Sequence, residues 1–208
     1  MSTSTATTLD SHFTSAQSQE ISNAMEAIFK MFGGADKFYT ETGILNLTFE
    51  YVAQLTSAGS VEVACYIGNG MIEMTSAAFN PAPLVSGWFI AHEVGHAFDF
   101  SLSGGDPKRY RSQVFVDHFV PKSCWAKFWG LPSCKVAPFV GCGGSTWASH
   151  VIGTGTTRRG EDNSAEDFAD TFAVAYALSV IQQSLPYRSF NSQWRLDEVT
   201  SMILGKSI

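Results

Sequence analysis

The chain has 208 residues, of which 45% are hydrophobic and 15% are charged, and its formal net charge is −6. This length and composition suit one folded domain and are not those of a disordered chain. The acidic balance argues against a general nucleic-acid-binding protein, which would carry a basic surface. No apolar stretch reaches the ~18 residues that a membrane-spanning helix needs.

The first part of the chain predicts a helix followed by strands. Residues 1–18 are rich in serine and threonine, which is typical of a flexible tail. Apolar residues at helical spacing then predict a helix over residues 19–32. We expect three antiparallel strands after it, and a Gly-Asn-Gly turn between the second and the third is a hairpin signal. The strand-like segments are residues 44–52, 61–68 and 70–79.

The second part predicts helices that flank an irregular insert. Ser86 is a candidate N-cap for a helix over about residues 87–102. Residues 103–160 are rich in glycine, proline, cysteine and tryptophan and predict an insert with little regular structure. Further helices are expected over about residues 164–184 and 192–204. This order of elements predicts an α+β domain with a small, mostly antiparallel sheet.

The cysteines indicate disulfide bonds rather than a structural metal site. None of them forms a CxxC pair, and three lie in the predicted insert; the four are Cys65, Cys124, Cys134 and Cys142. Such crowding favours disulfides in an oxidising compartment, with three possible pairings. The alternative is buried thiols in a cytosolic protein. We expect a secreted protein, and because the N-terminal residues lack the pattern of a signal peptide, the chain would be its mature form.

The segment WFIAHEVGHAFDF, residues 88–100, contains two histidines four positions apart. On a helix, His92 and His96 share one face and can present two imidazole nitrogens to one zinc ion. Glu93 is rotated by about 100° and can reach a water on the metal, as in the H-E-x-x-H arrangement of metallopeptidases. Gly95 costs this helix up to ~1 kcal/mol, which a closely packed neighbour would explain. The alternative is two ordinary histidines on a half-buried helix.

A catalytic zinc site usually needs a third protein ligand. The chain has neither a histidine six residues after His96 nor an aspartate in a GTxxD motif. The remaining option is a glutamate on the next helix, and NSAEDFADTFAVAYAL supplies Glu166 in the first turn. Asp170, one turn later, can accept a hydrogen bond from a ligand histidine, and Asp99 is a second candidate for such support. Alternatively, Glu166 only favours the positive end of its helix.

The segments HEVGHAFD and AEDFADTFA together resemble the glutamate-zincins, and within them the branch of the anthrax lethal factor catalytic domain and the clostridial Pro-Pro endopeptidase. The resemblance implies a zincin-like domain over residues 19–208, with His92, His96 and Glu166 as zinc ligands and Glu93 as general base. It also implies an edge strand that holds an extended peptide by β-addition. The segment in the expected place comprises Met71, Ile72, Glu73 and Met74.

The sequence departs from this family pattern at two points. The insert between the histidines and the glutamate is not part of the pattern. The resemblance also implies a tyrosine seven residues before the glutamate ligand, to stabilise the oxyanion, and this chain has Arg159 there. A cation can stabilise developing negative charge as well. The other candidates for this role are Arg158, His150, Tyr110 and Tyr176.

These features predict a secreted zinc endopeptidase that acts as a monomer on peptide or protein substrates, without nucleic-acid or membrane partners. A zincin-like module that binds a peptide or a glycan without catalysis is the alternative. A domain with a coincidental HEVGH segment and no metal is a third interpretation. The aromatic residues of the insert are expected to build a small second core, and a recognition surface is the alternative for them.

Overall fold

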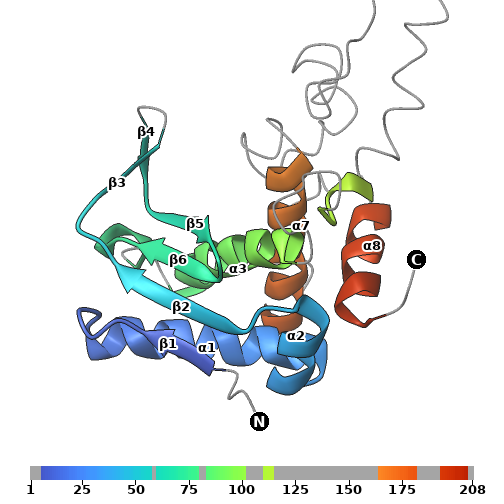
Figure 1. The fold of residues 1–208 in the computed structure, drawn as a ribbon, viewed down its shortest axis with the longest axis horizontal. Helices are drawn as coiled ribbons and strands as arrows, with labels where there is room; N and C mark the ends of the chain where they lie inside the picture. Colours follow the sequence, from blue (N-terminus) through green and yellow to red (C-terminus); the bar gives the residue numbers. More distant parts are fainter. Residues whose placement is uncertain are drawn as a thin grey trace, which may run out of the picture.

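The computed structural model describes residues 6–57, 60–79, 83–101, 110–114, 164–181 and 193–205. In these residues the predicted α+β class is confirmed, with five α-helices and a four-stranded sheet around one continuous core (Figure 1). Most of the predicted insert at residues 103–160 lies outside the described residues. The same holds for His150, Arg158, Arg159 and three of the cysteines.

The N-terminal segment contributes to the sheet. The strand β1 (Ala6–Leu9) pairs in parallel with β2 (Asn46–Tyr51), and α1 (Ser15–Phe32) begins earlier than predicted. Thr14 caps α1, because its hydroxyl accepts a hydrogen bond from the N–H of Gln17 while the Gln17 side chain accepts one from the N–H of Thr14. The flexible tail predicted for residues 1–18 is therefore wrong from residue 6 onward.

The sheet is mixed rather than mostly antiparallel. Its order is β1-β2-β6-β5, and both β1/β2 and β2/β6 are parallel pairs. The predicted hairpin is confirmed, since β5 (Ala64–Gly68) and β6 (Met71–Met74) pair antiparallel across a tight turn. Parallel neighbours need a crossover. Here α1 and α2 (Ala35–Thr42) return the chain from β1 to β2, and a ribbon of β3 (Leu55–Ser57) and β4 (Ser60–Glu62) leads from β2 to β5.

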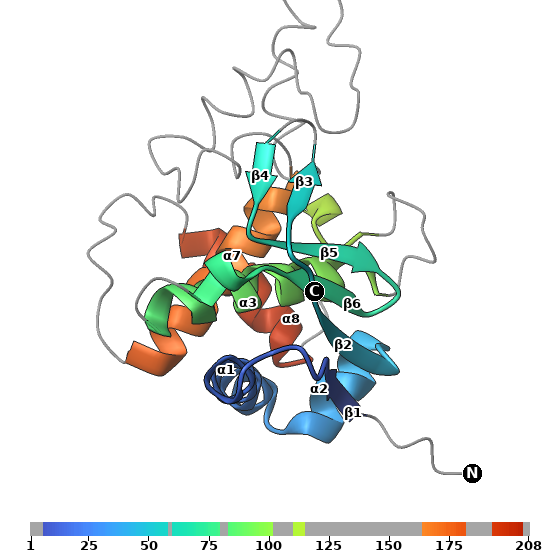
Figure 2. The same ribbon diagram turned by 90° about the vertical axis from the view of Figure 1, so that its left-hand side faces the viewer.

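The helix that carries the two histidines is α3 (Pro83–Phe100). It follows the short 3-10 helix η1 (Ser76–Phe79) and begins before the predicted position, with a proline at its first residue, where a missing N–H costs nothing. Ser86 is not the N-cap; it lies inside the helix, and its hydroxyl donates to Oε2 of Glu20 on α1 at 2.6 Å. The helix packs against α1, β5 and α7, which explains why it is apolar around most of its surface (Figure 2).

A close approach between helices brings α7 (Ser164–Ile181) against α3. A Cβ atom at Gly95 would lie 3.0 Å from Cα of Ala169 and 3.1 Å from Cβ of Phe172. The closely packed neighbour expected at this glycine is thus confirmed. Side chains larger than hydrogen at position 95 would push the two helices apart, so the glycine determines how near α7 lies to the histidines.

Two further contacts hold this helix pair in place. Arg111 lies at the C-terminal end of α3, where its guanidinium donates to the carbonyl oxygen of Phe98 and stacks over the Phe98 ring at 4.1 Å. On the other side, α8 (Gln193–Ile203) places the buried Arg195 against Asp167 of α7, with Nε and Oδ2 2.9 Å apart. Among the described helices, none has the length and apolar character to cross a membrane.

Candidate metal centre

Three side chains from α3 and α7 converge on one point. Nε2 of His92 and Nε2 of His96 lie 3.1 Å apart. The carboxylate of Glu166 lies 3.3 Å from Nε2 of His92 through Oε2, and 3.5 Å from Nε2 of His96 through Oε1. The ligand-type atoms of the three residues all lie within 4.8 Å of one another, and the two histidines are buried. This group could hold a metal ion, as the sequence predicted for these three residues.

The spacing can be compared with that of a small tetrahedral cation. Ligand atoms at 2.0–2.1 Å from such an ion occupy corners that are about 3.3–3.4 Å apart. The two imidazole nitrogens are 3.1 Å apart, and each has one carboxylate oxygen of Glu166 close to that spacing, Oε2 at 3.3 Å from His92 and Oε1 at 3.5 Å from His96. Two nitrogens and one carboxylate oxygen also form a donor set that leaves a fourth corner for water. The residues therefore fit an ion of this kind without rearrangement of the helices.

His92 is oriented by a buried carboxylate. Its Nδ1 lies 2.9 Å from Oδ1 of Asp170, which is 1% exposed and one turn beyond Glu166 on α7. Because an ionised carboxylate only accepts, Nδ1 carries a proton, and Nε2 is the nitrogen that faces the other two side chains and would bind a metal once it has lost its own proton. The arrangement is the support that the sequence predicted for Asp170.

His96 is supported in a different way. Its ring stacks on Phe100, with centroids 5.6 Å apart and planes at 26°. Asp99 does not hydrogen-bond either histidine in the described residues; its Oδ1 accepts from the N–H of Ser112 at 2.6 Å. The expectation that Asp99 orients a ligand histidine is thus not met, and this carboxylate instead fixes the segment that follows α3. Burial raises the pKa of Asp99 to about 6, although the hydrogen bonds from Ser112 act to lower it.

The charges of the three converging side chains depend on one another. Burial by itself would lower the pKa of His92, but hydrogen bonds to Asp170 and Glu166 outweigh it and raise this pKa to about 10. Burial would raise the pKa of Glu166, but its hydrogen bonds to His92 and His96 hold it well below its usual range. Without a metal the site therefore holds a proton between its imidazoles and the carboxylate, and a cation bound there would replace that proton.

Glu93 lines the same cleft but points to a different neighbour. Its Oε2 accepts a hydrogen bond of 2.7 Å from the backbone N–H of Tyr66 on β5. The cleft has a volume of about 300 Å³, and its lining includes the three ligand candidates, Glu93 and residues 64–66 of β5. The carboxylate of Glu93 thus lies in the same cleft as the three ligand candidates and is held by the strand at the sheet edge.

The predicted substrate strand has to be corrected. Met71, Ile72, Glu73 and Met74 form β6, which is flanked by β2 and β5 and therefore has no free edge. The two edge strands of this sheet are β1 and β5, and β5 is the one that packs on α3 (Figure 2). Residues 64–66 of β5 also line the cleft. The N–H of Tyr66 points away from β6 toward Glu93, so alternate residues of β5 direct their backbone groups to the open side.

Of the residues predicted to stabilise the oxyanion, the two that the structure describes lie at different distances from the metal centre. Tyr176 lies ten residues beyond Glu166 on the same helix, about 15 Å along its axis. Its hydroxyl lies beside Gly87, and the ring lines a separate cavity between α1 and α7, so its position does not support this role. Tyr110 packs on Phe100, with ring centroids 4.4 Å apart, one ring removed from His96. Arg158, Arg159 and His150 lie outside the described residues.

Sequence reasoning missed two residues of the site, Tyr66 and Phe100. Tyr66 supplies the N–H that binds Glu93, and Phe100 supplies the ring beneath His96. Phe100 had a signal in the sequence, because it is four residues after His96 and so on the same helical face. Tyr66 had none, since its contact with Glu93 depends on how β5 packs on α3.

Comparisons with known proteins found no relative of this chain. No protein-family model matches the chain, no curated protein matches its sequence, and no solved structure matches its fold. The resemblance to glutamate-zincins therefore stays a prediction from the two short sequence segments.

Proposed function

We propose that the chain is a zinc-dependent endopeptidase, with His92, His96 and Glu166 as the metal ligands and Glu93 as the general base. The observation that carries the proposal is the convergence of two imidazole nitrogens, 3.1 Å apart, on the carboxylate of Glu166, whose oxygens lie 3.3 and 3.5 Å from them, with the carboxylate of Glu93 in the same cleft. Imidazole nitrogen and carboxylate oxygen are both zinc ligands, and one His–His–Glu set with an open corner is typical of catalytic sites.

Bound zinc would supply an activated water and polarise the scissile carbonyl. The residues of the chain would do the rest. Glu93 would take the proton of the attacking water and deliver it to the leaving amine. The N–H of Tyr66 holds Oε2 of Glu93 at 2.7 Å, so that the other oxygen is available for the proton. Asp170 keeps the proton of His92 on Nδ1 and so keeps Nε2 available for the metal.

An extended peptide fits this site as an added strand on β5. The strand is at the sheet edge and passes directly beside Glu93. Backbone pairing with outward-facing groups of β5 other than the N–H of Tyr66, which binds Glu93, would hold the peptide independently of its sequence. Pockets along the strand would select side chains. The proposal also includes secretion and action as a monomer, which rest on the cysteine pattern and on the sequence prediction alone.

The proposal is tested by cleavage of a diverse peptide pool, with products identified by mass spectrometry. The wild-type protein is compared with Glu93→Gln, which keeps the shape of the side chain and removes its basicity. Metal content is measured in both, so that each carries one zinc per chain. Cuts made by the wild type and not by the variant are expected. If neither protein cuts while both hold zinc, the chain is better described as a peptide- or glycan-binding module.

A further inference from the structure

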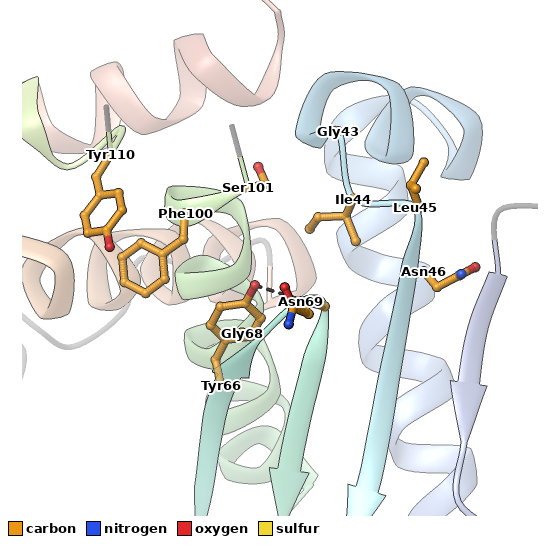
Figure 3. Close-up of a pocket in the computed structure, with 11 residues that line it drawn as sticks. Gly43, Ile44, Leu45, Asn46, Tyr66, Gly68, Asn69, Phe100, Ser101 and Tyr110 are labelled. Carbon is orange, nitrogen blue, oxygen red and sulfur yellow. Dashed lines mark hydrogen bonds between the residues drawn. The ribbon is translucent and has the colours of Figure 1, made fainter. Parts of the chain in front are cut away.

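A second cavity lies next to the metal-centre cleft, at the C-terminal end of β5 (Figure 3). Its volume is about 600 Å³, twice that of the cleft itself and within the range of small-ligand pockets. Its walls come from the segment before β2, the β5–β6 turn, the end of α3 and the segment around residue 110. The residues that matter for its chemistry are Ile44, Leu45, Tyr66, Gly68, Phe100 and Tyr110.

The cavity and the cleft share a wall. Tyr66 and Phe100 line both spaces. The backbone N–H of Tyr66 binds Glu93, and the ring of Phe100 stacks on His96, so the same two residues contact the reaction centre and the cavity. A molecule that lies across the metal centre along β5 would therefore reach the cavity without a break in the surface.

The lining is uncharged in the described residues; it includes three aromatic rings and two aliphatic side chains, and its other side chains are the polar ones of Asn46, Asn69 and Ser101. The rings of Tyr66 and Tyr110 lie on either side of Phe100, at centroid distances of 6.0 and 4.4 Å. The hydroxyl of Tyr66 accepts a hydrogen bond from the N–H of Gly70 at 3.3 Å, so it is held at the turn (Figure 3). At the opposite wall Leu45 lines the cavity and is 68% exposed, so a large apolar side chain is available there to a bound molecule.

The direction of β5 indicates which part of a substrate would enter. A strand added to β5 in the antiparallel sense runs from Gly68 toward Ala64, and antiparallel pairing has the more favourable hydrogen bonds. The metal centre faces residues 64–66, and the cavity begins at Tyr66 and extends past Gly68. Gly68 lies two residues, or ~6.6 Å, beyond Tyr66 along the strand. A side chain in the cavity would then belong to a residue before the scissile bond.

We propose that this cavity is a specificity subsite that accepts an aromatic or large aliphatic side chain, two to three residues N-terminal to the bond that is cut. The inference rests on the proposed peptidase function. It names the substrate class of that function as peptides with such a residue upstream of the cleavage site, and it assigns Leu45 as a specificity-determining residue at the cavity mouth.

The test uses the full-length, zinc-loaded protein and a pool of peptides with equal amounts of each amino acid at every position. The wild type is compared with Leu45→Glu, which introduces a charge at an exposed position and so has little effect on folding. The matched control is Val180→Glu, because Val180 lies near the far end of α7 from Glu166, is 46% exposed and lines neither the cavity nor the metal-centre cleft. Cut sites are aligned, and kcat/KM is measured for paired peptides that differ only as phenylalanine or alanine at the enriched position.

The wild type is expected to enrich phenylalanine, tyrosine, tryptophan or leucine upstream of the cut, with about a tenfold preference for phenylalanine over alanine from burial of the larger side chain. Leu45→Glu is expected to lose most of that preference with little change on the alanine peptide, while Val180→Glu keeps it. The subsite proposal is overturned, and the proposed peptidase function is kept, by any of three results. These are cuts without enrichment upstream, enrichment only downstream of the cut, or equal effects of the two variants. No cuts by the zinc-loaded wild type would overturn the peptidase function and the subsite together.

Discussion

Replacement of Gly95 by alanine is expected to separate the two helices that carry the metal ligands. The added Cβ would lie 3.0 Å from Cα of Ala169 and 3.2 Å from its carbonyl oxygen, and both are backbone atoms that cannot rotate away. To restore an ordinary contact of 3.4 Å, α7 has to move by about 0.4 Å relative to α3. Metal sites hold their ligand distances to about ±0.2 Å, so a shift of this size weakens binding.

Two effects on stability oppose each other in this variant. Overpacking of a close helix contact costs about 1–3 kcal/mol. Alanine recovers about 1 kcal/mol through its greater helix propensity. The metal-free variant is therefore expected to be less stable by ~1 kcal/mol. Zinc affinity is expected to fall by on the order of tenfold, which reduces the stabilisation by zinc at a fixed free concentration by ~1.4 kcal/mol.

The assay is denaturant unfolding with a chelator and at a buffered free-zinc concentration, for the wild type, Gly95→Ala and Gly33→Ala. Gly33 ends α1 with φ of 82°, so alanine there costs about 1–2 kcal/mol of stability without touching the contact between α3 and α7. The control is expected to lower stability equally in both conditions. Gly95→Ala is expected to lose ~1 kcal/mol with the chelator and a further ~1.4 kcal/mol with zinc. An unchanged zinc increment in Gly95→Ala would refute the role of this contact in positioning Glu166.

Two further predictions concern His92 and its partner. Asp170→Asn is expected to lower zinc affinity by about 10–100-fold in a competition titration with a chelator, since the carboxylate that orients His92 is lost; wild-type affinity would contradict this role. At pH 7 zinc binding is expected to release about one proton, because the pKa of His92 in the metal-free protein is raised to about 10. Calorimetry in buffers of different ionisation enthalpy measures this number, and release of no proton would show that His92 is neutral before zinc binds. In the metal-free protein, the raised pKa of His92 also stabilises the folded state. This contribution to the free energy of unfolding is fully present below pH 6.5, the ordinary pKa of histidine, and is lost as the pH rises toward 10.

The metal centre could be predicted from the sequence because its geometry is local to two helices. Positions four apart on α3 place His92 and His96 on one face, and the same rule places Glu166 and Asp170 together on α7. Gly95 also carried a readable signal, since a glycine inside an apolar helix pattern indicates close packing. These local features come together because α7 packs against α3. The sequence indicated this packing in one way: the two histidines on α3 need a third ligand, and α7 offers Glu166.

The parts that were not predicted depend on contacts between distant segments. Strand β1 is four residues long in a serine- and threonine-rich segment, and its pairing with β2 spans about forty residues, so composition suggested a tail. The strand order could not be derived either, because the alternation within β6 shows one buried face but not its neighbours. The substrate strand was therefore placed on β6 instead of β5. Asp99 was assigned by its helical face, whereas the backbone at Ser112 determines its partner.

The central claim is that Glu93 acts as a base at a zinc site formed by His92, His96 and Glu166. The most direct test is the rate of cleavage of the best peptide from the pool, measured for wild type and Glu93→Gln at equal zinc content. General-base catalysis contributes about 10²–10⁴-fold, so the account predicts a loss of at least about a hundredfold in kcat with zinc still bound. Equal rates for the two zinc-loaded proteins would contradict it.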